Sequence, residues 1–415
     1  MYTRPHRSLF VFMLSGLAML SCAKKTTSRL DEGLSLYRQN RLEEARPLLE
    51  EAVQQESQNP DAHAWLAETY RRLQQTDQAI GSARQALELD ACHGFAHTVL
   101  AWAYNPLYGS WEQASADTTW YHLLRAAQCD SADGNVWIGI WVEAIRRGER
   151  DLEKKALRVF MDTEFFTPAL LAYNRWMLRH LPKSALLLTN GDMDTYPAVA
   201  LQEVEHFRTD VLVVNRSLLN TAWYARYLRD GYKVPLPFGD AELDALRPQQ
   251  AENGKMILVA DQILQGWLDL RKRNAFPRPI AISVTVGDLS FAADTQDHLR
   301  LAGPFYSWLP VPAESPQDTA ILRASLAHID GSDFSGSLVS PQDRSPVRMM
   351  HTNEIVTNIT AAAMRYSQAL IESGRASEAL EMLSWAEKFE AKTELGPVSA
   401  KGIAELKKVA KEKLP

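Results

Sequence analysis

Cysteine, long apolar runs and excess positive charge are all scarce in this 415-residue sequence. Three cysteines are too few to staple a fold in the manner of disulfide-rich secreted domains. Beyond the first 22 residues no stretch reaches 18 apolar residues, which excludes a multi-span membrane protein. With 45 basic against 51 acidic residues, the net charge is −6, so we expect no nucleic-acid partner.

Recognisable catalytic motifs are absent as well. The sequence has no Gly-x-Ser-x-Gly, no Walker loop, no Gly-x-Gly-x-x-Gly and no His-Glu-x-x-His. His93 and His97 stand four residues apart beside Cys92, a spacing that zinc ligands use, but His97 falls at an ordinary position of a repeat helix. We therefore expect packing rather than a zinc site there.

The composition is that of a folded protein with several structural units. The chain is 46% hydrophobic and 23% charged, as soluble globular proteins are. A length of 415 residues exceeds the roughly 250–300 residues at which a single hydrophobic core stops growing. Two or more units are therefore expected.

Residues 1–21 are expected to be a signal peptide. Arg4 and Arg7 precede an apolar run, Leu9–Leu20, that is too short to cross a bilayer comfortably. The run ends in Leu20-Ser21-Cys22, which resembles a bacterial lipobox, with Met19 where an aliphatic residue is usual.

The lipobox resemblance implies that Cys22 is the lipidated first residue of the mature protein. An ordinary cleaved signal followed by a free thiol is the alternative. Residues 22–28 would form a tether, and Ala23 after the cysteine favours the outer membrane, facing the periplasm. Membrane contact would then come from the lipid anchor alone.

Residues 29–181 carry a repeat with a period of 34 residues, which is the tetratricopeptide length. Each such unit is a pair of antiparallel helices, and small residues let the helices approach closely. The matched positions are Gly33, Ala67 and Ala101; Leu36, Tyr70 and Tyr104; Ala45 and Ala79; Ala52 and Ala86. We expect a third unit lengthened by an insertion at residues 105–109 and a degenerate fourth unit at residues 134–166.

Aromatic and cysteine residues in this array raise two further questions. Six of the eleven tryptophans lie between Trp65 and Trp141. We expect them to fill helix interfaces, with a ligand-stacking role for Trp111 and Trp120 as the alternative. Cys92 and Cys129 both follow second helices. We expect them to stay unpaired, because adjacent hairpins often lie beyond the Cα separation that a disulfide tolerates; a disulfide formed in an oxidising envelope is the alternative.

Residues 182–350 change to an α/β pattern. Two apolar runs, Ala185–Leu188 and Val211–Val214, are separated by a helix-like stretch, Pro197–Phe207, which is the spacing of parallel strands. Farther on we expect a helix at Met256–Arg273, a strand at Ile280–Val286 and irregular structure from Gly287 to Pro346. Residues 351–415 are expected to form a tetratricopeptide-like helical hairpin and tail. The predicted fold class is thus α plus α/β: an N-terminal tetratricopeptide helical array, a small parallel α/β sheet domain and a C-terminal helical hairpin.

Residues 165–392 resemble the soluble C-terminal region of a bacterial family of multi-pass membrane proteins related to protein O-mannosyltransferases. The resemblance is carried by LLLTNGDMDTYPAVALQEVEHFRTDVLVVNRSLLNTAWY, by RPIAISVTVGDL and by LRLAGPFYSWLPV. Met193 stands where the family motif has Asn, and Thr209 where it has Pro. The membrane helices and acidic loop in which such transferases work have no counterpart here, so the resemblance does not imply transfer activity.

Polar residues follow both predicted strands, and parallel strands would bring them together at the carboxyl edge of the sheet. Asp192-Met193-Asp194 matches the Asp-x-Asp pattern by which some transferases hold Mg²⁺ or Mn²⁺. We favour the alternative that Asp192 or Asp194, with Thr195, caps the helix that opens near Pro197. No cofactor is therefore expected, with a divalent metal as the lesser alternative.

These residues would make a polar pocket with an aromatic wall, suited to a glycan. The candidate ligand-binding residues are Asn190, Gly191, Asp192, Asp194, Thr195, Tyr196, Gln202, Glu203, Asn215, Ser217, Asn220, Trp223 and Tyr224.

The sequence predicts a lipid-anchored, non-enzymatic scaffold of the cell envelope that binds a protein or glycan partner through its repeats and α/β domain. The alternative is an enzyme that acts on a sugar or sugar-phosphate at the carboxyl edge of the sheet, with Asp192 and Asp194 as its metal-binding or acid–base groups.

Overall fold

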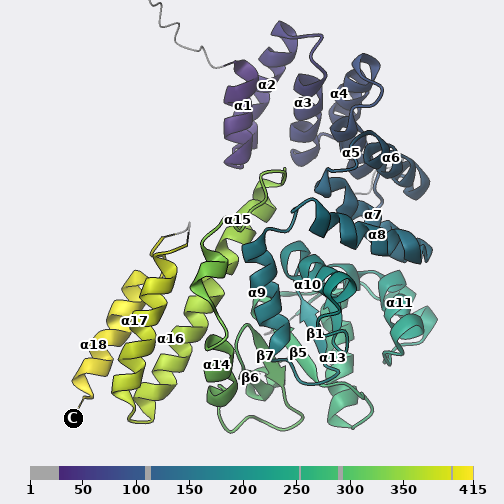
Figure 1. The fold of residues 1–415 in the computed structure, drawn as a ribbon. Helices are drawn as coiled ribbons and strands as arrows, with labels where there is room; N and C mark the ends of the chain where they lie inside the picture. Colours follow the sequence, from purple (N-terminus) through teal and green to yellow (C-terminus); the bar gives the residue numbers. More distant parts are fainter. Residues whose placement is uncertain (1–27, 108–113, 252–253, 288–292, 394–395, 415) are drawn as a thin grey trace, which may run out of the picture.

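A computed structural model describes residues 28–107, 114–251, 254–287, 293–393 and 396–414 (Figure 1). The predicted signal peptide, Cys22 and Trp111 lie outside these residues. A helical array, a small sheet domain and C-terminal helices follow one another along the chain, as the fold class predicted (Figure 1).

In the described residues, the array consists of four helical hairpins whose facing positions are small. Ala45, Ala52, Ala79 and Ala86 are fully buried, so the 34-residue period corresponds to helix contacts. A Cβ on Gly33 would lie 2.8 Å from Leu49, which explains a glycine there. The helices are α1 (Arg29–Arg38), α2 (Leu42–Gln55), α3 (Pro60–Arg72), α4 (Thr76–Leu89), α5 (Gly94–Ala103), α6 (Ala116–Cys129), α7 (Gly134–Arg147) and α8 (Arg150–Asp162).

Within the first, second and fourth hairpins, the turn between the two helices uses one residue in the left-handed region. Asn40 (φ 59°) and Gln74 (φ 62°) occupy equivalent positions 34 residues apart, and Gly148 (φ 74°) ends α7 in the same way. In each turn the amide of this residue donates to the carbonyl three residues back, for example Gln74 N to Arg71 O at 3.1 Å. Such a turn satisfies carbonyls that the helix end leaves unpaired.

Cys92 and Cys129 form a disulfide, which corrects the expectation that they stay unpaired. Their Cα atoms are 5.2 Å apart, inside the range that a disulfide needs. Cys129 is the last residue of α6 and Cys92 lies in the turn before α5, so both stand at the same end of the α5–α6 hairpin. At this end of the hairpin the two Cα atoms are therefore closer than adjacent hairpins usually are, and a disulfide can form.

The sheet has five strands in the order β2-β1-β5-β7-β6. The strands are β1 (Leu186–Thr189), β2 (Leu212–Asn215), β5 (Ile280–Ser283), β6 (Leu299–Leu301) and β7 (Phe305–Trp308). The predicted parallel pairing of β1 with β2 is present, with Leu186 opposite Leu212, and β5 joins β1 in parallel. Because β7 and β6 are antiparallel, the sheet is mixed rather than wholly parallel.

Helix α10 (Asp192–Glu205) begins five residues before the predicted start at Pro197, which lies inside it. A proline there cannot donate to the carbonyl four residues back, that of Met193. Asn174 Nδ2, on the buried face of α9 (Pro168–Arg179), donates to Met193 O at 3.1 Å instead. A side chain from another helix thus supplies the donor that Pro197 lacks.

Three other boundaries differ from the sequence predictions. The predicted helix from Met256 starts at Val259 as α13 (Val259–Lys272), because Met256–Ile257 forms β4 of a small hairpin with β3 (Gln249–Gln250). The predicted strand to Val286 ends at Ser283 and continues as a 3-10 turn, Val284–Val286. The stretch predicted to be irregular contains β6, β7 and α14 (Thr319–Leu326). The pairing of β6 with β7 could not be recognised from such short segments in a proline-rich stretch. The remaining helices of this part are α11 (Ala222–Tyr232) and α12 (Asp240–Ala245), with short 3-10 turns η1 (Leu218–Asn220), η3 (Ala293–His298) and η4 (Gly331–Phe334).

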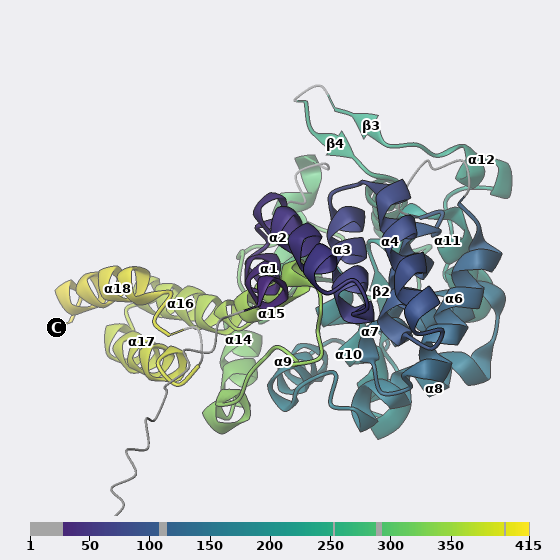
Figure 2. The same cartoon turned by 90° about the horizontal axis from the view of Figure 1, so that it is seen from above.

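Four helices close the chain: α15 (Pro346–Ile355), α16 (Thr357–Glu372), α17 (Ala376–Glu390) and α18 (Ala400–Glu412). The turn between α16 and α17 contains Gly374 (φ 77°), whose amide donates to Ile371 O at 3.2 Å, as in the repeats. Seen from above, α1 and α2 lie over α15, while α16–α18 extend to one side (Figure 2). Among the described helices, none combines the length and apolar character that a membrane crossing requires.

Candidate functional site

The polar clusters that follow β1 and β2 converge, as their parallel pairing implies. Ser217 Oγ donates to Asn190 O at 3.0 Å, and Asn215 Nδ2 donates to Thr195 Oγ1 at 3.0 Å. Thr195 is fully buried. The carboxyl edge of β1 and β2 is thus a connected polar layer between the sheet and the repeats.

Asp194 caps α10. Its carboxylate accepts from Gly191 N and from Asn190 N, both at 2.9 Å, and from the Thr285 hydroxyl. Burial raises the pKa of Asp194, while the bond from Thr285 and the two backbone amides oppose that rise. Asp194 thus acts as a capping carboxylate through both oxygens, but from the third residue of a helix that begins at Asp192 rather than near Pro197. The Thr195 hydroxyl bonds Thr189 and Asn215 instead.

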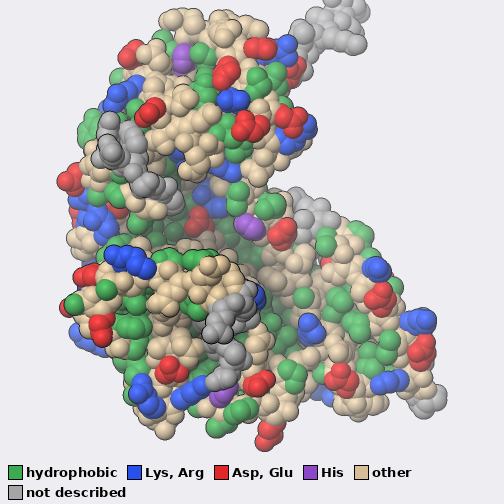
Figure 3. Space-filling model, turned by 180° about the vertical axis from the view of Figure 1, so that it is seen from behind, with side chains coloured by type: hydrophobic (Ala, Val, Ile, Leu, Met, Phe, Trp, Pro, Cys, Tyr) green, Lys and Arg blue, Asp and Glu red, His purple; other side chains and the backbone are tan. Residues whose placement is uncertain are grey.

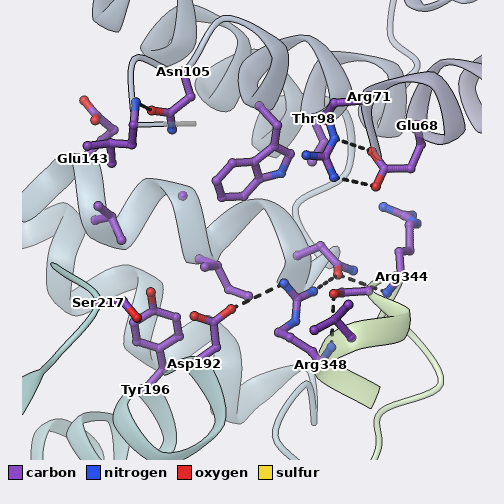
Figure 4. A pocket seen from close by; sticks show the side chains of 18 of the residues that line it. Glu68, Arg71, Thr98, Asn105, Glu143, Asp192, Tyr196, Ser217, Arg344 and Arg348 are labelled. Carbon is purple, nitrogen blue, oxygen red and sulfur yellow. Dashed lines mark hydrogen bonds and ion pairs between the residues drawn. The ribbon is translucent and has the colours of Figure 1, made fainter. Parts of the chain in front are cut away.

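Asp192 instead faces Arg348 of α15, with Oδ2 and Nη1 3.5 Å apart (Figure 4). Burial raises the pKa of Asp192, and the Arg348 guanidinium opposes the rise. The other nitrogens of Arg348 are engaged more closely: Nη2 donates to Asp343 Oδ1 at 2.6 Å and to Asn135 Oδ1 at 2.8 Å. Burial lowers the pKa of Arg348, but the contacts with Asp343 outweigh this, so the net pKa is raised and the guanidinium remains charged.

A cavity of about 340 Å³ lies between the inner face of the repeats and this polar layer (Figure 4). We call it the groove cavity. The space-filling view shows the molecule hollowed between its upper and lower parts (Figure 3). Helices α3, α5 and α7 supply one wall, and α10, the end of β2 and α15 supply the other. Its lining includes Glu68, Arg71, Phe95, Thr98, Trp102, Asn105, Asn135, Ile138, Val142, Asp192, Tyr196, Asn215, Ser217, Leu218, Arg344, Val347 and Arg348.

Glu68 and Arg71, two charged residues of the groove cavity, pair with each other. Glu68 is 6% exposed and accepts from Arg71 Nε and Nη2, both at 2.7 Å. The Tyr37 hydroxyl can donate either to Glu68 Oε1 at 3.0 Å or to Arg344 O at 3.1 Å. Apolar side chains such as Ile138, Val142 and Leu218 lie between these polar groups. The groove cavity is therefore lined by a surface of mixed polarity.

A second cavity, of about 410 Å³, opens at the carboxyl ends of β1 and β5. We call it the sheet-edge cavity. Asp192 and Arg348 belong to the linings of both cavities, so their ion pair forms a shared wall. The remaining lining includes Asn190, Gly191, Asp194, Thr285, His351, Glu354 and Asn358.

Other candidate residues lie away from this site. Gln202 donates to the carbonyl oxygens of Arg208 and Val211 and so fixes the turn before β2. Glu203 lies 3.6 Å from Arg158, and with Gln202 and Tyr224 it lines a separate cavity beside α8 and α11. The Tyr224 hydroxyl accepts from Asn215 N at 3.3 Å. Asn220 Oδ1 accepts from Ala260 N at 3.1 Å, and Trp223 is half-buried on α11. The predicted single pocket is therefore divided.

Sequence reasoning missed the residues that the repeats and α15 contribute. Asn135, Arg344 and Arg348 were not candidates, because nothing local in the sequence marks them. The positions within about one turn of the matched Ala67 and Ala101 were the available clue, since they include Glu68, Arg71 and Thr98.

The two histidines first noted in the sequence serve packing and capping. His93 Nδ1 accepts from Ala96 N at 3.1 Å at the start of α5, and its Nε2 lies 3.1 Å from Asp61. His97 Nδ1 lies 2.9 Å from His122 Nδ1 between α5 and α6. Within the part of the chain that the structure describes, no group of three or more His, Cys, Asp or Glu side chains is placed to hold a metal ion.

Family models match two parts of the chain. Residues 36–92 match the tetratricopeptide repeat, and residues 171–238 match TMEM260-associated domain 2, which spans β1, α10, β2 and α11. A search of curated proteins finds no match.

Solved structures that match the chain were also found. The crystal structure of TTC0263, a thermophilic TPR protein of Thermus thermophilus, is 20% identical over 52% of this chain and 94% of that chain, with a TM-score of 0.32. The structure of Naa15/Naa10 bound to HypK-THB is 13% identical over 91% of this chain and 60% of that chain, with a TM-score of 0.21. The chain thus contains tetratricopeptide repeats, followed by a region that matches TMEM260-associated domain 2.

Proposed function

We propose that this protein is a scaffold of the cell envelope that binds a segment of a partner protein in the groove cavity. Tetratricopeptide arrays commonly bind protein partners on their inner face. The observation that carries the proposal is that the repeats, α10 and α15 together line one cavity of mixed polarity. The α/β domain then completes the binding groove rather than acting apart from the repeats.

The envelope location is supported by two features of the chain. The lipobox-like sequence before Cys22 implies a lipid anchor. The Cys92–Cys129 disulfide is of a kind that persists outside the reducing cytosol. A Cys22→Ala variant should leave the membrane fraction after cell fractionation, and its retention there would overturn the anchor.

Site-specific photo-crosslinking tests the groove. A benzoylphenylalanine replaces Val347, which lines the groove cavity, or Leu89 at the end of α4, outside its lining; both native residues are 37% exposed. We expect a discrete protein adduct, identified by mass spectrometry, from position 347 and not from position 89. Equal labelling from both positions, or none from 347, would contradict a groove-bound protein partner.

A glycan is the second candidate partner, because Phe95 and Trp102 line the groove cavity beside the amides of Asn105 and Asn135. Aromatic faces and amides are the groups that hold sugar rings. For the alternative of a sugar-active enzyme, Asp192 remains as the carboxylate not used for capping. Calorimetric titration of Mn²⁺ and envelope glycans into wild type and Asp192→Asn tests both ideas. Binding that the substitution abolishes would support a site at Asp192, and no heat with either protein would reject both.

A further inference from the structure

Part of the concave face of the repeats is already covered by the protein's own chain. We call the segment Ser340–Ser345, which leads into α15, the strap. Figure 1 shows the chain reaching α15 just below α1 and α3. The strap separates the groove cavity from another cavity of about 680 Å³ lined by Tyr37, Trp65 and Asp133.

The side-chain amide of Asn135, on α7, bonds the strap backbone at two points. Asn135 Nδ2 donates to Gln342 O at 2.7 Å, and Asn135 Oδ1 accepts from Arg344 N at 3.2 Å. The amide thus spans an acceptor and a donor on alternate residues of a non-helical segment. On the strap's side these two bonds use only backbone groups. Another peptide in the same conformation, with an N–H at the position of Arg344, can therefore make them.

The Arg344 side chain occupies a pocket specific to its chemistry. Its Nη1 lies 2.5 Å from Asp133 Oδ2, and the Asp133 side chain is only 4% exposed. The guanidinium carbon lies 4.4 Å from the centroid of the Phe95 ring, a cation–π distance. A buried carboxylate and an aromatic face together select a cation, and the planar guanidinium fits both.

We propose that the groove recognises an extended partner segment that carries an arginine, and that Gln342–Arg344 is the chain's own copy of that ligand. This inference rests on the proposed scaffold function. The partner's arginine takes the place of Arg344 between Asp133 and Phe95. The partner's backbone forms the hydrogen bonds to the Asn135 side-chain amide that the strap now makes. An acidic side chain is disfavoured at the Arg344 position, because its carboxylate would face the buried Asp133.

The experiment supplies the strap in trans. The probe is a fluorescent peptide with the sequence of residues 340–347, Ser-Pro-Gln-Asp-Arg-Ser-Pro-Val. Its binding to the full chain is followed by anisotropy. In wild type the tethered strap competes at an effective concentration in the mM range. In Arg344→Ala the arginine pocket is empty, so we expect the peptide to bind at least about tenfold more tightly than to wild type.

Matched variants make the result specific. Arg375→Ala removes an arginine that pairs with Glu378 on the surface, and it should bind the peptide as wild type does. Arg344→Ala combined with Asn135→Ala should lose the gain, and a peptide with alanine at its arginine should bind none of the proteins. Melting curves establish that each variant is folded; should Arg344→Ala fail to fold, Arg344→Lys is used, with a smaller gain expected.

Two outcomes would overturn the inference. One is a folded Arg344→Ala protein that binds the peptide no better than wild type, and the other is equal binding of the arginine and alanine peptides. Either result, together with a protein adduct from position 347, leaves the scaffold function standing while the arginine specificity fails. Loss of the adduct itself counts against the scaffold function.

Discussion

Asp192 Oδ2 and Arg348 Nη1 lie 3.5 Å apart on the wall shared by the groove cavity and the sheet-edge cavity. Asp192 is the first residue of α10, just after β1, and Arg348 lies in the first turn of α15. Since Arg348 also bonds Asn135 of α7, three parts of the chain meet at this guanidinium. The pair therefore ties the repeats to the sheet domain at the cavity wall.

Asp194 and Asp192 should respond differently to substitution. Asp194→Ala removes the acceptor for two backbone amides, so we expect the free energy of unfolding to fall by about 1–2 kcal/mol. Asp192→Asn should change it by less than about 0.5 kcal/mol, because Asp192 is partly exposed and Arg348 keeps Asp343. Urea unfolding of the two variants provides the measurement. Equal losses would contradict the division into a capping and a cavity-facing carboxylate.

The disulfide should stabilise the repeats measurably. It closes a loop with a sequence separation of 37 residues. A loop of that size corresponds to about 4 kcal/mol of stabilisation, because the cross-link restricts the unfolded chain. Urea unfolding of Cys92→Ser/Cys129→Ser should show this loss, and dithiothreitol should destabilise wild type but not the variant. A variant as stable as wild type would indicate that the bond does not form in solution.

Two helical glycines should have opposite effects when replaced by alanine. A Cβ on Gly134, at the start of α7, would lie 2.2 Å from the Phe165 ring, so Gly134→Ala should destabilise by about 2 kcal/mol through overpacking. Gly81 in α4 has nothing within 4 Å, so Gly81→Ala should stabilise by about 0.5–1 kcal/mol. Thermal melts of both variants test the close packing of α7 directly. A neutral Gly134→Ala would refute it.

The His97–His122 pair should make stability depend on pH. Burial lowers the pKa of His122 to about 4, and the nearby His97 and Arg84 add to this effect. Burial also lowers the pKa of His97. Arg125 and His93 lower it further, while the Ala91 carbonyl and Asp90 oppose the shift. In the unfolded chain both titrate near 6.5, so the unfolded state takes up protons first as the pH falls. The stabilisation is complete above about pH 6.5 and is lost toward pH 4.

Urea unfolding between pH 7 and pH 4.5 measures this effect, which we expect to be on the order of 1–2 kcal/mol. A His122→Gln variant should show a shallower dependence, since only one histidine of the pair remains. The same slope in both proteins would show that other groups cause the pH dependence.

Local regularities account for what the sequence predicted well. The 34-residue period requires only neighbouring hairpins to pack, and β1 and β2 are adjacent in both sequence and space. The capping by Asp194 likewise involves residues three and four positions away. These contacts are short-range, so one sequence contains the information needed to infer them.

Long-range contacts account for what was missed. The early start of α10 depends on Asn174, which replaces the donor absent from Pro197. The antiparallel strands β6 and β7 lie in a proline-rich stretch whose pattern resembles loops. Arg344 reaches the groove from the strap and Arg348 from α15, and both lie more than 200 residues beyond Asn135. No local pattern indicates such a pairing.

Because the strap lies far beyond the repeats in the sequence, the repeats are synthesised before the strap that covers them. The bonds from the strap to Asn135 and Tyr37 join residues 207 and 307 positions apart. The repeats leave the ribosome first and contain their own local contacts, whereas the strap does not exist until residue 345 has been made. The nascent protein therefore passes through a stage in which its concave face is complete in sequence and uncovered, and the strap can cover that face only after residue 345 has been made.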